Sequence, residues 1–159
     1  MQSLIFLAVM TALSVGFLQT PVSRLNGVDN RTVTMPLQNV FASSQRKSAK
    51  IILLWRADCA PCLVELQRLA ALRQAAGETE IVTLALDTKA QAQTAITRHS
   101  LPISDGYVTS ASPRQVMLST GQPFALLPMA VAVSGNGKIC GSHVGILGTL
   151  KVRDWAARC

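Results

Sequence analysis

The sequence contains few of the residues from which metal sites and nucleic-acid surfaces are built. Its two histidines, His99 and His143, lie 44 positions apart, and it has a single Cys-x-x-Cys pair. A structural zinc site takes four ligands, commonly from two such pairs or from closely spaced histidines, so the composition disfavours zinc. The net charge is +7, but no run of five basic residues occurs, and the aromatic residues are four Phe, two Trp and one Tyr. Scattered basic charge of this kind is typical of a solvated surface and disfavours nucleic-acid binding.

Charge is also absent from residues 4–18, LIFLAVMTALSVGFL. This length suits the apolar part of a secretory signal peptide better than a membrane-spanning helix, which needs about 20 residues. The preceding Met-Gln-Ser lacks the usual Lys or Arg, and a buried core helix is the competing interpretation. We predict export to the periplasm or another extracytoplasmic space, with residues 1–18 as either a cleaved signal peptide or a retained membrane anchor.

Residues 19–32 are polar and rich in turn residues, which predicts a linker. Residues 33–159 then form one domain.

The order of the predicted elements indicates an α/β fold. Short apolar runs between turn residues predict buried strands, and Leu and Ala at helical spacing predict helices. The expected strands lie at 50–55, 80–87 and 129–133, with a hairpin partner after the turn at 134–137 and shorter strands within 32–41 and at 105–108; the expected helices lie at 60–76, 89–99, from 112 onward, and at 147–158. Strands joined through helices should be parallel and a hairpin antiparallel. We therefore predict a central mixed sheet flanked by helices on both faces.

The most informative motif is Cys59-Ala-Pro-Cys62, which directly follows the predicted strand at 50–55. Here the first cysteine falls at the start of a helix, where free N–H groups and the helix dipole stabilise negative charge. A thiol in such a position has a lowered pKa and is present as the reactive thiolate. Pro61 suits the first helical turn. The spacing therefore favours a redox centre in which Cys59 attacks and Cys62 resolves the mixed disulfide.

Other uses of the same two sulfurs stay open at this point. Two thiolates can hold Cu(I), which would make the chain a copper-binding chaperone. An inert structural disulfide is a further alternative. The remaining cysteines, Cys140 and Cys159, are left to pair with each other in an oxidising compartment, or to stay free.

The segment LLWRADCAPCLVEL resembles the active-site segment of thioredoxin-fold proteins, in particular the TlpA/ResA-like exported thiol-disulfide oxidoreductases. The resemblance covers about residues 33–158. Trp55 stands four residues before Cys59, and Glu65 stands three after Cys62, where these exported reductases carry an active-site acid. LLPMAVAVSGNGKICGSHVG is similar to the region that bears the cis-proline of the fold, which assigns that role to Pro128. The resemblance implies a thioredoxin-like fold.

The resemblance also implies roles for individual residues. A cis Pro128 would face the two cysteines, and the Leu127 backbone would hydrogen-bond an extended substrate segment as a short added strand. Glu65, half buried, would take up or deliver the proton of Cys62. Trp55 would pack beside the cysteines. An ordinary trans proline, a solvated Glu65 and a plain core tryptophan are the structural alternatives.

Two positions depart from the family pattern. Asp58 directly precedes Cys59, where an uncharged residue is usual, and a carboxylate there should oppose thiolate formation or select basic substrates. Leu53 occupies the position where cytosolic thioredoxins keep a buried acid, so Glu65 would have to serve instead. In the fold, the elements that carry Cys140 and Cys159 lie near the sheet edge, which allows a disulfide that would stabilise by roughly 3 kcal/mol.

The implied activity is the reduction of protein disulfides, with substrates such as apocytochrome c or copper-site cysteines. A membrane electron donor of the DsbD or CcdA type would restore the dithiol, and no organic cofactor is needed. A disulfide oxidase or isomerase on the same fold is the enzymatic alternative. The copper-binding chaperone and a non-catalytic interaction domain are the alternatives from other classes.

Overall fold

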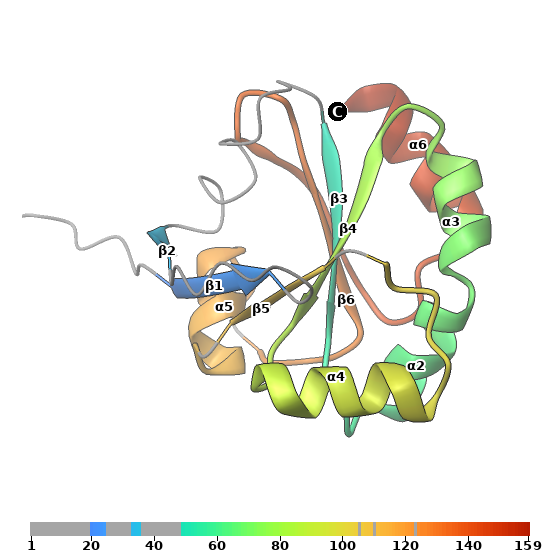
Figure 1. Cartoon of the computed structure of the whole chain (residues 1–159). Helices are drawn as coiled ribbons and strands as arrows, with labels where there is room; N and C mark the ends of the chain where they lie inside the picture. The colour runs from blue at the N-terminus through green and yellow to red at the C-terminus, as the bar shows by residue number, and fades with distance from the viewer. Residues whose placement is uncertain (1–19, 25–32, 36–48, 105, 110, 123) are drawn as a thin grey trace, which may run out of the picture.

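A mixed sheet with helices on both faces forms the domain, as the sequence predicted (Figure 1). The structure is a computed structural model that describes residues 20–24, 33–35, 49–104, 106–109, 111–122 and 124–159. The described strands are β1 (Thr20–Arg24), β2 (Val33–Met35), β3 (Lys50–Trp55), β4 (Glu80–Ala85), β5 (Tyr107–Thr109), β6 (Met129–Val133) and β7 (Ile139–Val144). The described helices are α2 (Ala60–Gln67), α3 (Leu69–Ala76), α4 (Lys89–Arg98), α5 (Pro113–Ser119) and α6 (Thr149–Arg158).

The strands follow the order β2-β1-β5-β4-β3-β6-β7. As expected from their helical connections, β3 and β4 are parallel, and so are β4 and β5. The hairpin strand β6 runs antiparallel to both β3 and β7. All six residues of β3 are buried because the strand is central and both faces of the sheet are covered. This central strand delivers the Cys-x-x-Cys motif at its carboxyl end.

The two faces of the sheet have separate cores. Side chains from α2, α3, α4 and α6 pack with one set of strand residues, which includes Ile51, Leu53 and Trp55. The alternate strand residues Ile52 and Leu54 face the other way, against α5. The period of two along a strand explains why neighbouring apolar residues of the same run serve different layers.

Helix starts follow the capping signals of the sequence. Thr88 and Gln91 form a reciprocal capping box at α4, and Ser112 and Gln115 form another at α5. The helix predicted over 60–76 differs, because it is broken into α2 and α3 at Arg68, whose φ of −91° and ψ of 7° depart from the helical region. The Arg68 N–H bonds to Glu65 in a tight turn. The sequence has no proline or glycine at this point, so the break could not be predicted from it.

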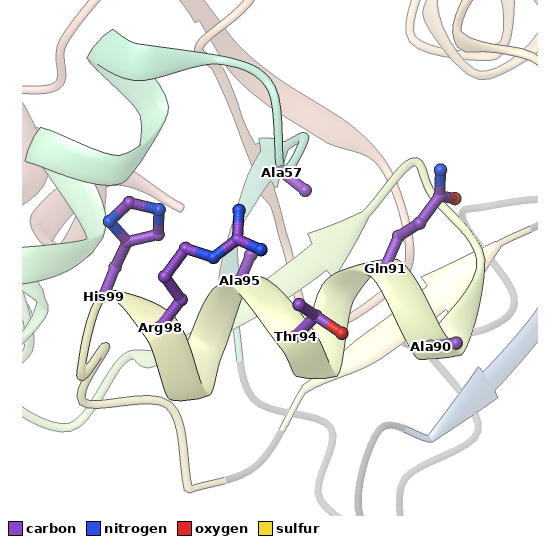
Figure 2. Close-up of a pocket in the computed structure, with 7 residues that line it drawn as sticks. All are labelled: Ala57, Ala90, Gln91, Thr94, Ala95, Arg98 and His99. Atoms are coloured by element: carbon purple, nitrogen blue, oxygen red, sulfur yellow. The ribbon is translucent and has the colours of Figure 1, made fainter.

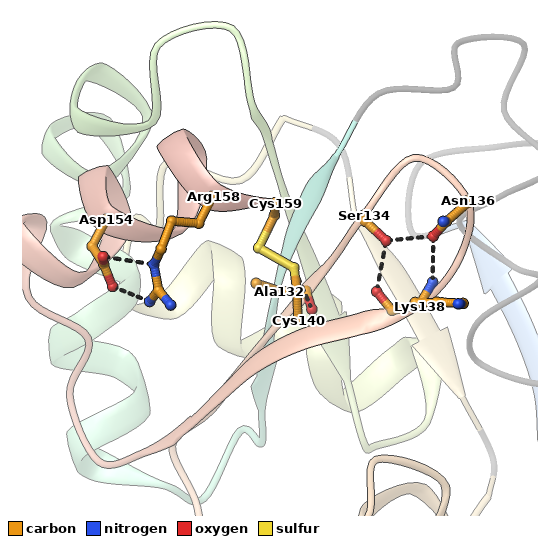
Figure 3. The surroundings of a disulfide bond; sticks show 8 residues. All are labelled: Ala132, Ser134, Asn136, Lys138, Cys140, Asp154, Arg158 and Cys159. Carbon is orange, nitrogen blue, oxygen red and sulfur yellow. Dashed lines mark hydrogen bonds and ion pairs between the residues drawn. A yellow bond between two sulfur atoms is a disulfide. The ribbon is translucent and has the colours of Figure 1, made fainter.

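The closing helix α6 is fastened to the edge strand β7 by covalent and packing contacts (Figure 3). Cys140 on β7 and Cys159 at the end of α6 are joined in a disulfide with a Cα–Cα distance of 6.0 Å. Beside it, a Cβ placed on Gly141 would lie 2.5 Å from Trp155 Nε1, so only glycine allows this approach. The ion pair between Asp154 and Arg158 lies along the outer side of the same helix.

The start of the chain is only partly described. Five residues of the predicted linker, Thr20–Arg24, form β1, which pairs antiparallel with β5 and so joins the sheet. The strand expected within 32–41 corresponds to β2, and its later part lies outside the described residues. The apolar segment 4–18 also lies outside them. Among the residues that the structure does describe, no helix combines the length and apolar character needed to cross a bilayer.

Candidate active site

The Cys59–Cys62 pair lies where the central strand β3 passes into α2. Cys59 is the N-cap residue of α2, and its Sγ accepts a hydrogen bond from the Cys62 N–H at 3.3 Å. The two residues form a disulfide with a Cα–Cα distance of 5.2 Å. Cys59 is partly exposed, whereas Cys62 is fully buried. This difference in access matches an attacking cysteine followed by a resolving one.

The turn that presents Cys59 is held from the neighbouring strand. Asp87, just past the end of β4, accepts a hydrogen bond from the Ala57 N–H at 2.6 Å. Its other carboxylate oxygen lies 3.5 Å from Nε of Arg56. The Asp87 side chain is only 4% exposed, so these two partners stabilise its charge in place of water. The geometry of the turn between β3 and α2 thus depends on a residue 30 positions away.

Arg56 also forms an ion pair with Asp58, at 3.0 Å between Nη2 and Oδ2. The Asp58 side chain is 70% exposed. Both water and the guanidinium therefore screen the carboxylate that precedes Cys59. The sequence predicted that Asp58 opposes thiolate formation, but it had no means of showing that Arg56 is its partner.

Glu65 is more deeply placed than the half-buried position predicted for it. The residue is 1% exposed, and its Oε1 accepts a hydrogen bond of 2.6 Å from the Leu147 N–H, in the loop before α6. Burial raises the pKa of the Glu65 carboxyl above its ordinary value of 4.5, although this hydrogen bond and the Arg68 charge act in the opposite direction. Glu65 follows Cys62 by one helical turn, so the two side chains lie on one face of α2. The site thus holds a buried acid that binds its proton more tightly than an exposed glutamate does.

The peptide bond between Leu127 and Pro128 is cis. Pro128 directly precedes β6, and its carbonyl accepts a hydrogen bond of 2.8 Å from the Gly145 N–H. In the sheet, Met129 pairs with Leu54, which places the cis-proline at the same end of β3 as the turn to Cys59. Residues 127–128 and 59–62 are therefore brought together although 65 positions separate Leu127 from Cys62 in the sequence.

Trp55 packs in the apolar core beneath the two cysteines. Its side chain is fully buried in the same apolar cluster as Cys62, and partly exposed Cys59 packs against that cluster. The buried indole Nε1 has no hydrogen-bond partner among the described residues. Leu53, two residues earlier, is also fully buried and apolar, so β3 supplies no acid to this face, and the buried acids of the site are Glu65 on α2 and Asp87 after β4.

Sequence reasoning did not assign Asp87, Arg56 or the Leu147 N–H to the site. The sequence offers one indication of its role: Asp87 is an acid that lies between a predicted strand and a predicted helix. The contact of Arg56 with Asp87 and that of the Leu147 N–H with Glu65 join residues far apart in the sequence, so local spacing does not encode them. No group of three or more His, Cys, Asp or Glu side chains suited to a metal ion occurs in the parts of the chain that the structure describes.

Comparisons with known proteins agree with this architecture. No family model and no curated protein matches the sequence. Solved structures do match: a thioredoxin-related protein from Neisseria meningitidis has a TM-score of 0.60 and 22% identity, covering 78% of this chain and 91% of that one. StoA from Bacillus subtilis has a TM-score of 0.57 and 16% identity, covering 84% and 95%. A secreted Mycobacterium tuberculosis disulfide oxidoreductase homologous to Escherichia coli DsbE has a TM-score of 0.57 and 13% identity, covering 90% and 97%.

These likenesses define the fold as thioredoxin-like, which confirms the predicted fold class. The chain covers nearly the whole of each of these proteins, so the likeness concerns a complete domain. Within this thioredoxin-like fold, the close pair Cys59–Cys62 occupies the turn between the central strand and its helix.

Proposed function

We propose that this protein is an exported thiol-disulfide oxidoreductase that reduces disulfides in other proteins. The observation that carries the proposal is the partly exposed Cys59 at the N-terminus of α2, bonded to a buried Cys62. The helix N-terminus stabilises a Cys59 thiolate once the pair is reduced. Two of the structural neighbours are described as disulfide oxidoreductases or thioredoxin-related proteins, which supports the same chemistry.

The reaction is a two-electron exchange. In the dithiol form, the Cys59 thiolate attacks one sulfur of a substrate disulfide, and the other substrate sulfur leaves as a thiolate that takes a proton from water. Cys62 then loses its proton and attacks Sγ of Cys59, which releases the second substrate thiol and forms the Cys59–Cys62 disulfide. The substrate is reduced and the protein is oxidised.

Glu65 is the proposed acid–base group of the second step. Cys62 is fully buried, so its thiol needs a proton acceptor within the protein to become a nucleophile. Glu65 lies one turn further along α2 and is itself buried. Because burial raises its pKa, the carboxyl exchanges a proton more readily near neutral pH than an ordinary glutamate does.

The surroundings favour a protein substrate over a small thiol. Large apolar side chains are exposed before the cis-proline, at Phe124 (70%) and Leu126 (55%), and after β7, at Ile146 (42%). Exposed apolar groups that cluster near a reactive centre are typical of a protein-docking surface. The Leu127 backbone forms no hydrogen bond with the described residues, which suits pairing with an extended substrate segment.

The proposed location is extracytoplasmic. Two disulfides in one small domain indicate an oxidising compartment, and one neighbour is described as secreted. Reduction in such a compartment needs an electron source across the membrane, so we propose a membrane dithiol donor of the DsbD or CcdA type. Cytochrome c maturation and copper-site assembly are the proposed settings.

The reduction potential of Cys59–Cys62 tests the direction of the reaction. The purified protein is equilibrated with dithiothreitol or glutathione buffers, with the Cys140→Ser/Cys159→Ser variant as a control that isolates the active pair. A potential near about −270 mV, as in thioredoxin, supports a reductase. A potential near about −120 mV indicates a disulfide donor instead and overturns the proposed direction. Failure to exchange with dithiothreitol refutes the enzyme and leaves Cu(I) binding or a structural role.

A further inference from the structure

A pocket of about 300 Å³ lies beside the turn that precedes Cys59 (Figure 2). Ala57 of that turn forms one wall, and the exposed face of α4 forms the other. Two further alanines, Ala90 and Ala95, line it, and their small side chains leave the space open. The volume is at the lower limit for ligand pockets, which suits a single side chain better than a separate cofactor.

Arg98 is the permanently charged side chain of the pocket, whose lining also includes His99 and Thr94. No aspartate or glutamate lines it. The acids near the turn are already paired, since Asp58 and Asp87 both face Arg56. Arg98, by contrast, forms no ion pair with any of the described residues. In Figure 2 its side chain extends from α4 towards the turn that carries Ala57.

Gln91 gives the pocket a second donor. Its Oε1 accepts the Thr88 N–H at 3.1 Å in the capping box of α4. The amide oxygen is thereby held against the helix start, and Nε2 is left to face outward. Figure 2 shows the Gln91 side chain on the same side of α4 as Arg98. The guanidinium and the amide N–H₂ both donate hydrogen bonds, as recognition of a carboxylate requires, and the Thr94 hydroxyl of the lining can donate as well.

The distance to the reacting sulfur defines what can bind. Ala57 precedes Cys59 by two residues, so their Cα atoms lie at most about 7 Å apart. An extended peptide rises about 3.3 Å per residue. A side chain in the pocket therefore belongs to a residue two or three positions from the cysteine that Cys59 attacks.

We propose that the pocket between α4 and the active-site turn binds an acidic side chain of the substrate protein, near the disulfide to be reduced, through Arg98 and Gln91. This inference rests on the proposed function and adds a specificity for its substrates. It reverses the preference for basic substrates that Asp58 suggested, because Arg56 is paired with Asp58, whereas Arg98 has no ion-pair partner among the described residues. The competing interpretation is that Arg98 only complements the carboxyl-terminal dipole of α4.

Three matched peptides test the proposal. Each carries one cysteine as a 2-thiopyridyl disulfide, with Glu, Gln or Lys three residues away. The protein is first reduced and freed of reductant. In one turnover, Cys59 attacks the peptide sulfur and expels 2-thiopyridone, whose absorbance is recorded, and Cys62 then releases the peptide thiol. The assay compares the wild type with Arg98→Gln and with Arg114→Gln, an equal charge loss at an exposed arginine of α5, on the other face of the sheet.

We expect the wild type to react about threefold faster with the Glu peptide than with the Gln peptide, and slowest with the Lys peptide, as for a partly exposed ion pair. Arg98→Gln should abolish this preference and Arg114→Gln should keep it, and 1 M salt should weaken it. Equal rates in the wild type, a preference that survives Arg98→Gln, or an equal loss in both variants would overturn the pocket as the source of specificity. Absence of reaction with all three peptides would instead refute the proposed function.

Discussion

Cys59–Cys62 and Cys140–Cys159 lie towards opposite ends of the central strands. Cys59 follows the carboxyl end of β3. Cys140 lies near the other end, because the next residue, Gly141, pairs with Ala132, and Ala132 pairs in turn with Ile51 near the start of β3. They also lie at opposite ends of helices. Cys59 caps the N-terminus of α2, and Cys159 caps the C-terminus of α6. The helix dipole therefore favours a thiolate at Cys59 and disfavours one at Cys159.

The groups around the two disulfides also differ, and again the reactive surroundings belong to Cys59–Cys62. The first pair has a buried acid, Glu65, one turn away and a cis-proline at the same end of the sheet. The second pair joins the edge strand β7 to α6 across 19 positions. A disulfide that closes a longer loop constrains the unfolded chain more. The difference in position and surroundings suits the first disulfide to the proposed redox chemistry and the second to stabilisation of the fold.

The largest expected effect comes from removing the attacking sulfur of the first disulfide. Cys59→Ser should lower the rate of disulfide reduction by at least about a thousandfold, because the thiol that remains in the motif, Cys62, is fully buried and out of reach of a substrate disulfide. Reduction of insulin by the dithiothreitol-primed protein measures this rate. Cys159→Ser is the matched control and should retain wild-type activity. Equal losses in both variants would mean that the second disulfide takes part in the exchange.

The reciprocal change removes the second disulfide. Cys140→Ser/Cys159→Ser should lower the free energy of unfolding by about 3 kcal/mol, since about 20 residues are no longer closed into a loop. For a domain of this size the melting temperature should fall by roughly 10 °C. Urea denaturation and thermal melting, both without reductant, provide the measurement. The potential of Cys59–Cys62 should be unchanged, and a shifted potential would argue that the two disulfides are coupled.

Glu65→Gln tests the buried acid that lies beside the first disulfide. We expect the resolving step to slow by about a hundredfold, as for loss of a general base. The inflection that Glu65 contributes to the pH profile of this step should also disappear. Stopped-flow decay of a preformed mixed disulfide at Cys59 measures both. Glu78→Gln, at an exposed glutamate after α3, is the control. A slower rate with an unchanged pH profile would indicate a structural role.

The same variant has a stability signature whose sign follows from the raised pKa of Glu65. Below the ordinary value of 4.5, the carboxyl is protonated in both states and its burial is not opposed by charge. As the pH rises through the higher pKa of the folded state, the unfolded chain binds fewer protons, so the wild type loses stability. Glu65→Gln should lack this loss, and urea denaturation across this pH range would reveal it.

The smallest effect concerns the charge next to Cys59. Asp58→Asn should raise the rate at which iodoacetamide alkylates the reduced protein by less than about threefold, because Arg56 and water already screen this exposed carboxylate. Arg56→Gln should slow alkylation, since it leaves the Asp58 charge uncompensated. A tenfold acceleration in Asp58→Asn would show that the ion pair does not neutralise the carboxylate in solution.

Much of this arrangement was predictable because it depends on short spacings. The apolar run 50–55, the Cys-x-x-Cys motif and the capping residues Thr88 and Ser112 each act within a few positions of the chain. The break at Arg68 was not predictable, because the helical pattern continues across it. The full burial of Glu65 was not predictable either, because it depends on Leu147, 82 positions away.

The sequence by itself determined the redox motif, the helix that follows it and the order of strands and helices, because hydrophobic periodicity and capping are local properties. Only the tertiary structure decided that Asp87 holds the active-site turn, that Arg56 pairs with Asp87 and that Arg98 is left to face a pocket. The physical reason is that charges are screened or left unpaired by whichever side chains the folded chain brings within a few ångströms, and parallel packing of β3 and β4 brings together residues about thirty positions apart.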